Sequence, residues 1–144
     1  MYEYKCRVTR VIDGDTIDVI LDLGFDIFHG CRVRLYGIDT PESRTRDLEE
    51  KARGLLSKKF LIEALLDKDT VIKTHKKDSK GKFGRVLGEV WADTININEK
   101  MVEKALAVRY YGQSKEDVKA AHSANAIILK ERGVYEEKEA KSKK

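Results

Sequence analysis

The sequence is poor in the residues that mark secreted, disulfide-stapled and membrane-spanning chains. Its 144 residues include one proline and two cysteines, and no apolar run is longer than about four residues. A helix that crosses a bilayer needs about twenty consecutive apolar residues, so we expect no contact with a membrane. The segment that begins at Met1 has no basic region followed by an apolar one, which predicts a cytoplasmic location.

Two cysteines cannot form the disulfide framework of a small secreted domain. Cys6 and Cys31 both lie in strand-like sequence, and we expect buried free thiols. Zinc is disfavoured, because these two cysteines and the nearby His29 fall short of the four ligands of a structural site.

Size and composition favour one folded unit. Hydrophobic residues make up 41% of the chain and charged residues 38%, which is enough apolar material for one core. We expect a single domain over residues 1–135, existing as a monomer. Residues 136–144 have no apolar periodicity, and we expect them to form a charged, disordered tail.

The net charge of +4 gives a mild preference for polyanions. The run from Lys73 to Arg85 contains six lysine or arginine residues and one acidic residue, Asp78. A solvated loop is one explanation of this run, and a phosphate-binding surface is the other.

Alternation and helical spacing predict the order βββ-α-ββ-α-α. The expected strands cover residues 4–12, 16–23, 25–38, 70–76 and 85–92, and the expected helices cover residues 48–67, 98–108 and 114–133. Five short strands in an open sheet would leave exposed edges, whereas a closed barrel has none. We therefore predict an α+β fold, a five-stranded oligonucleotide-binding-type barrel with three α-helices.

Two acidic segments stand at the ends of predicted strands. The first is Asp13-Gly14-Asp15-Thr16, and the second runs from Arg34 to Glu42 with the sequence RLYGIDTPE. Asp15, Asp39 and Glu42 could supply hard oxygen ligands for Ca²⁺ or Mg²⁺. Taken separately, the first segment is equally typical of a hairpin turn and the second of a helix start.

Three segments in this order resemble the staphylococcal nuclease family: VTRVIDGDT (8–16), RLYGIDTPE (34–42) and GKFGRVLGEVW (81–91). The resemblance runs from about residue 4 to residue 135. It implies that Asp15, Asp39 and the backbone carbonyl of Thr40 bind a metal. It also implies that Glu42 acts on the attacking water, and that Arg34 and Arg85 bind phosphate.

The resemblance further implies Ca²⁺ as the cofactor and DNA or RNA as the substrate, cleaved to a 3′-phosphate and a 5′-hydroxyl. Lys82, Phe83 and Tyr111 are the expected substrate-binding residues. Phe83 stands where the family often has tyrosine, and Gln113 stands where a second tyrosine is expected. An inactive barrel that binds nucleic acid or a protein partner is the alternative, although Arg34, Asp39, Glu42 and Arg85 are all present.

Overall fold

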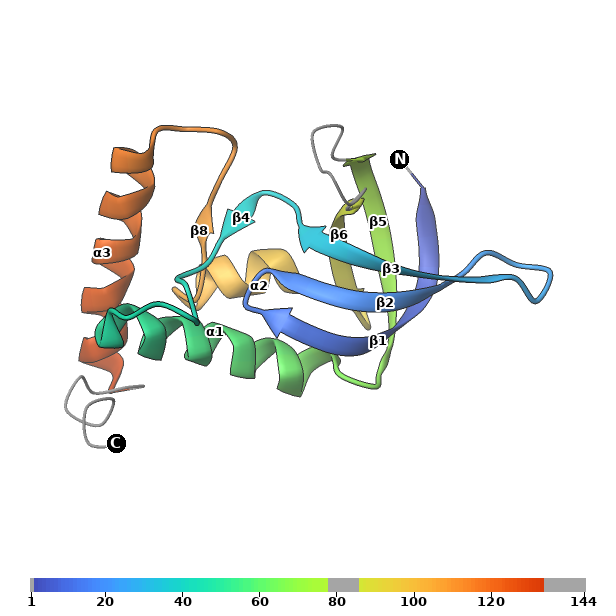
Figure 1. Ribbon diagram of the computed structural model, residues 1–144, viewed down its shortest axis with the longest axis horizontal. Helices are drawn as coiled ribbons and strands as arrows, with labels where there is room; N and C mark the ends of the chain where they lie inside the picture. The colour runs from blue at the N-terminus through green and yellow to red at the C-terminus, as the bar shows by residue number, and fades with distance from the viewer. Residues whose placement is uncertain (1, 78–85, 134–144) are drawn as a thin grey trace.

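The computed structural model describes residues 2–77 and 86–133, which form a closed five-stranded barrel with three helices (Figure 1). The barrel strands are β1 (Glu3–Asp13), β2 (Thr16–Asp22), β3 (Phe28–Leu35), β5 (Asp69–Lys77) and β6 (Val86–Ala92). They follow the order β3-β2-β1-β5-β6, and a parallel pairing between β3 and β6 closes the ring. The predicted fold class is confirmed.

Two short pairings extend this frame. β7 (Ile95–Asn96) adds to the edge of β6, and β4 (Ile38–Asp39) pairs with β8 (Val108–Arg109). The helices are α1 (Leu48–Leu65), α2 (Ile97–Glu103) and α3 (Lys115–Arg132). Figure 1 shows α3 at the end of the molecule opposite the turn between β2 and β3. None of the described helices is both long and apolar enough to span a bilayer.

Alternating apolar residues fill the barrel. On β2, Ile17, Val19 and Leu21 are buried, while Ile20 and Asp22 between and beyond them face outward. This period of two is what lets one face of a strand pack on the core. Side chains of α1 and α2 join the same core, among them Leu61, Leu65, Ile97 and Met101.

The third strand is shorter than the expected 25–38. Phe25 and Asp26 adopt left-handed backbone angles, with φ of 55° and 60°, which a strand cannot contain. The Leu23 N–H donates to the Ile27 carbonyl at 2.9 Å and closes this turn. At the other end Gly37, with φ of 79°, separates β3 from β4.

The second predicted helix also differs from expectation. α2 ends at Glu103 rather than near residue 108, because Ala105 takes a left-handed φ of 61° and the chain turns into β8. The last helix agrees with prediction: Ser114 caps its start and Gly133, with φ of 70°, ends it. Cys6 is a buried free thiol as expected, whereas Cys31 is only partly buried.

A buried asparagine holds the barrel closure. The Asn98 side-chain amide donates to the carbonyls of Tyr36 at 2.9 Å and Gly88 at 3.2 Å, and its oxygen accepts from the Val90 N–H at 3.1 Å. Asn98 is 2% exposed, so water could not take over its hydrogen bonds to these three backbone groups. One side chain on α2 therefore joins the end of β3 to β6.

Gly54 lets the loop that carries Glu42 lie directly on α1. A Cβ at this position would lie 2.7 Å from the Pro41 carbonyl oxygen and closer still to the Glu42 carbonyl. Glycine inside a helix normally costs about 1 kcal/mol relative to alanine. The close backbone approach explains why glycine is suited to this position.

We expect Gly54→Ala to destabilise the protein by about 1–3 kcal/mol, because the added methyl group must push the Pro41–Glu42 backbone off the helix. Urea unfolding followed by circular dichroism measures the change. Gly30→Ala is the matched control, since its nearest neighbour, the Val19 carbonyl oxygen, would be 4.0 Å from the new Cβ. A Gly54→Ala protein more stable than wild type would contradict the close contact.

Candidate active site

The two acidic segments of the sequence meet at one end of the barrel. A Cβ on Gly14 would lie 2.9 Å from Thr40 Oγ1 and 2.8 Å from the Ser57 Cβ, so the Asp-Gly-Asp turn packs on both residues. The Leu35 N–H also donates to the Asp15 carbonyl at 2.8 Å. The proximity of these two segments could not be predicted from the sequence alone.

Arg34 lies between the two aspartates that the resemblance assigns to the metal. Its Nη1 is 3.0 Å from Asp15 Oδ2, and its Nη2 is 3.6 Å from Asp39 Oδ1. Nη1 also donates to the Ile38 carbonyl at 3.2 Å. The side chain of Arg34 is 20% exposed. The guanidinium thus offsets part of the charge of two carboxylates while part of it stays accessible.

Asp15 is the most electrostatically perturbed residue of the site. Burial raises its pKa to about 7, and this effect outweighs the opposing pull of Arg34. The neighbouring Asp13 raises the pKa further, whereas a hydrogen bond from Thr16 Oγ1 at 3.0 Å lowers it. Arg34 offsets only part of the cost of burying the charged form of Asp15. A further cation beside the carboxylate would stabilise that charged form.

His122 on α3 holds the other aspartate. Its Nε2 lies 2.8 Å from Asp39 Oδ2, and among the described residues its buried Nδ1 has no hydrogen-bond partner. The sequence analysis did not identify this residue. The signal was present, because His122 shares one helix face with the buried Ala126 and Leu129 at spacings of four and three.

Glu42 faces an open pocket of about 590 Å³. The pocket lies between the Asp39–Glu42 segment, the start of α1 and the first half of α3, and Arg34, Asp39 and Thr40 also line it. The Glu42 backbone N–H donates to Glu50 Oε2 at 3.1 Å, while its own side chain is exposed. Its carboxylate is free of hydrogen bonds within the part of the chain that is described.

Arg53 on α1 forms part of the same pocket wall and was also missed by the sequence analysis. It is 8% exposed, and its Nε and Nη1 have no partner among the described residues. Its Nη2 lies 3.6 Å from Glu49 Oε1, a loose contact one helical turn away. The wall therefore carries buried positive charge that Glu49 offsets only in part.

A second pocket, of about 500 Å³, adjoins the first at Arg34. Tyr111 and Tyr110 line it together with Tyr36 and Leu87, and Tyr111 is 62% exposed. The ring of Tyr36 meets Tyr111 edge-on at 5.9 Å and stacks on His75 at 3.9 Å. An aromatic surface thus continues from Arg34, which is the geometry that a nucleobase would use.

Gln113, in the position where a second tyrosine was expected, shapes this loop rather than the pocket itself. Its side chain accepts from the Tyr111 N–H at 2.7 Å and donates to the Arg109 carbonyl at 2.7 Å. Lys82, Phe83 and Arg85 lie outside the described residues.

The sequence matches the family described as staphylococcal nuclease homologue over residues 32–144. The chain belongs to the staphylococcal nuclease family. It is 32% identical over 130 residues to an uncharacterized endonuclease of Escherichia coli, covering 90% of this chain and 75% of that protein.

Two further relatives are named as nucleases. A thermonuclease of Staphylococcus intermedius is 35% identical over 100 residues, which cover 69% of this chain and 56% of the relative. A micrococcal nuclease of Shigella flexneri is 31% identical over 122 residues, with coverage of 77% and 62%. The chain thus spans less than two thirds of the length of both.

In this member of the staphylococcal nuclease family, the donor set fits a hard cation that keeps several waters. Asp15 and Asp39 both lie against the guanidinium of Arg34, and Thr40 follows Asp39 directly. The described residues contain no group of three or more histidine, cysteine or acidic side chains placed to hold a metal. An all-protein cage of the zinc type is therefore absent from them, whereas Ca²⁺ accepts carboxylate, carbonyl and water oxygens together.

The raised pKa of Asp15 predicts an unusual pH dependence for the metal-free protein. Between the ordinary pKa of 3.8 and about 7, the unfolded chain has lost the proton that the folded chain keeps, so stability falls as the pH rises. Asp15→Asn imitates the protonated side chain. We expect it to be more stable than wild type at both pH 5 and pH 8, with the larger margin at pH 8, because wild type continues to lose stability up to a pH of about 7.

Urea unfolding in the presence of a chelator, at both pH values, measures this difference. Asp18→Asn is the control of opposite sign, because hydrogen bonding to Arg32 lowers the pKa of Asp18, so its charge stabilises the fold above the ordinary pKa. An Asp15→Asn protein that loses stability at pH 8 as Asp18→Asn does would contradict the burial argument.

Proposed function

We propose that this chain is a Ca²⁺-dependent nuclease that hydrolyses phosphodiester bonds in DNA, RNA or both and leaves 3′-phosphate and 5′-hydroxyl ends. The observation that carries the proposal is the convergence of Asp15, Arg34 and Asp39 beside a pocket that the free carboxylate of Glu42 faces. The names of its relatives support the same class of reaction.

Asp15, Asp39 and the Thr40 carbonyl would hold the ion, which when bound supplies positive charge against the phosphate in the transition state. Arg34 already lies against both carboxylates, so its guanidinium is positioned to share its donors with a phosphate oxygen. We assign Arg85 the same task on another oxygen, which the identity of the residue and the family resemblance support.

Glu42 is suited to act on water because its carboxylate is exposed to the pocket and forms no competing hydrogen bond within the described chain. It takes a proton from a water whose oxygen attacks phosphorus. The bond from phosphorus to the 5′ oxygen breaks, that oxygen gains a proton, and the phosphate stays on the 3′ oxygen. We assign substrate contacts to Tyr111 in the aromatic pocket, and to Lys82 and Phe83.

We expect Glu42→Gln to lower kcat by a factor of about 10²–10⁴, the range for a lost general base, and to leave Ca²⁺ affinity close to wild type. Cleavage of single- and double-stranded DNA and RNA with Ca²⁺, Mg²⁺ or EDTA, beside Ca²⁺ titration calorimetry, measures both quantities. Glu63→Gln is the matched control, since Glu63 is an exposed α1 residue outside the pocket.

Full cleavage in EDTA would overturn the metal requirement, and wild-type kcat in Glu42→Gln would overturn the assigned base. A wild-type protein that binds nucleic acid and cleaves nothing would establish the alternative, a binding module.

His122 provides a separate test of the metal site. We expect His122→Ala to weaken Ca²⁺ binding about 10–100-fold, because Asp39 loses the hydrogen bond that orients it. Calorimetric titration measures the affinity, and His29→Ala, an exposed residue on β3, is the control. An unchanged affinity would show that His122 does not position Asp39 for the ion.

A further inference from the structure

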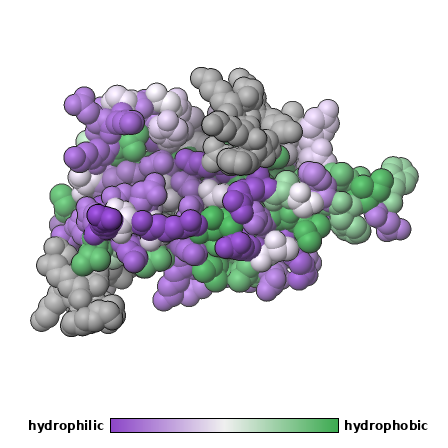
Figure 2. Space-filling model, viewed as in Figure 1, coloured by the Kyte–Doolittle hydropathy of each residue, from purple (hydrophilic) through white to green (hydrophobic). Residues whose placement is uncertain are grey.

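The turn between β2 and β3 carries large apolar side chains into solvent. Leu23, Phe25, Ile27 and Phe28 lie within six residues, and Phe25 is 97% exposed. Figure 1 shows the hairpin projecting from the barrel, and Figure 2 shows hydrophobic colouring at the same end of the molecule. We call residues 23–28 the hairpin tip. Contiguous exposed apolar side chains of this kind mark an interaction surface.

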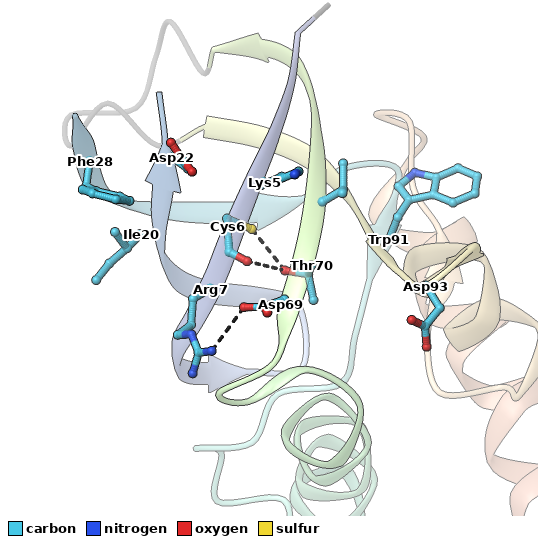
Figure 3. Close-up of a pocket in the computed structure, with 11 residues that line it drawn as sticks. Lys5, Cys6, Arg7, Ile20, Asp22, Phe28, Asp69, Thr70, Trp91 and Asp93 are labelled. Atoms are coloured by element: carbon cyan, nitrogen blue, oxygen red, sulfur yellow. Dashed lines mark hydrogen bonds and ion pairs between the residues drawn. The ribbon is translucent and has the colours of Figure 1, made fainter. Parts of the chain in front are cut away.

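A groove of about 660 Å³ lies at the base of this hairpin, on the outer face of the barrel (Figure 3). Ile20 and Phe28 form one wall and Trp91 the other, while β1 and β5 run between them. In the ladder, Val71 of β5 pairs with both Lys5 of β1 and Trp91 of β6, which places these three residues in one row. The groove is thus an aromatic-walled channel across the five strands of the barrel.

One cation in the groove can pair with one anion on the tip. Lys5 lies in the groove, is exposed, and forms no ion pair with the described residues. Arg7 beside it is already engaged, at 3.2 Å from Asp69. On the tip, Asp26 is exposed and likewise has no partner within the described residues. One surface therefore offers apolar walls with a free cation, and the other offers apolar side chains with a free anion.

We propose that two copies of this chain form a symmetric dimer in which the hairpin tip of each occupies the groove of the other. Phe25 and Ile27 enter between the partner's Phe28 and the partner's Trp91, and Asp26 faces the partner's Lys5. A two-fold interface requires a surface that is complementary to itself. A chain that carries both a tip and a matching groove meets this requirement, because the same contact forms twice in the dimer. The sequence alone predicts a monomer, because no periodicity marks an exposed turn as an interface.

Nucleic acid and anionic lipid are poorer occupants for these surfaces. The tip carries one acidic residue, Asp26, and no basic residue, and the groove holds Asp22, Asp69 and Asp93 against Lys5 and Arg7. A phosphate-rich surface would bring many negative charges against both, whereas the tip brings a single carboxylate that faces Lys5. A second copy supplies the missing cation to each tip.

The proposed interface is independent of the nuclease site. Asp15 precedes the first residue of β2 and Arg34 lies near the last residue of β3, whereas the tip joins the opposite ends of both strands. Changes to the tip should leave cleavage per chain unaltered, so association can be tested whether or not the proposed activity is correct.

Sedimentation velocity over a concentration range up to about 100 µM tests the proposal, since a weak dimer dissociates on dilution. We expect wild type to dimerise and Phe25→Asp to remain monomeric. Ile127→Asp is the matched control, because Ile127 is 60% exposed on α3, far from the tip, and should dimerise like wild type. Circular dichroism confirms that each variant is folded.

Reversing the charges of Lys5 and Asp26 tests whether these two residues contact each other across the interface. Lys5→Glu and Asp26→Lys should each raise the dimer Kd at least about tenfold, and the double variant should recover most of the affinity, since the pair is re-formed with its signs exchanged. A monomeric wild type at the highest concentration would overturn the proposal, as would a dimer that survives Phe25→Asp or a double variant no tighter than the single ones. Binding of wild type to lipid vesicles through Phe25, without self-association, would assign the tip to a membrane and overturn it too.

Discussion

The closure of the barrel is the constraint on which the site depends. Val33–Leu35 of β3 pair in parallel with Val86–Gly88 of β6, although about fifty residues separate them along the chain. Asn98 secures this join through hydrogen bonds to three backbone groups, those of Tyr36, Gly88 and Val90, at a depth that water does not reach. Because this pairing fixes β3, it also fixes the backbone of Arg34 and places the Leu35 N–H where it donates to the Asp15 carbonyl.

The candidate site contains buried charged side chains whose burial lowers the stability of the fold. Asp15 and Arg53 are buried, Asp39 is partly buried against His122, and two nitrogens of Arg53 have no partner among the described residues. Each of these groups carries a desolvation cost. Arg34 offsets the cost for the two aspartates, but one guanidinium shared between two carboxylates leaves negative charge uncompensated. Proteins tolerate such arrangements where ligand binding completes them, which is why the same residues are candidates for a cation and a phosphate.

Much of the fold could be predicted from local patterns, and the elements that could not share a physical cause. The second strand follows from its alternation of apolar and polar residues, and the last helix follows from its Ser114 cap and Gly133 stop. The predicted third strand is too long because Phe25, Ile27 and Phe28 favour a strand, whereas the backbone is left-handed at Phe25 and Asp26. Propensity does not register a single φ value that tertiary structure imposes.

The aspartates and Arg34 could be found because they stand in ordered motifs. His122 and Arg53 stand in no motif. The helix face of His122 indicates only that it is buried, and the role of each residue is identified by what it touches: Asp39 across 83 residues in one case, and a pocket wall in the other. No local rule could have linked either of them to the Asp-Gly-Asp turn. Similarly, exposed apolar residues in a turn are not informative until the groove beside them is known.

The register between β2 and β3 limits how this chain can change. Thr16 pairs with Arg34 at one end of the ladder and Asp22 pairs with Phe28 at the other, with no irregularity between them. Deleting one residue inside β2 would turn every later side chain to the opposite face, exchanging core residues for charged ones and moving the turn away from Arg34. Residues can be added or lost at the tip without this penalty, so we expect length variation in this hairpin to be tolerated at the turn and excluded from its strands.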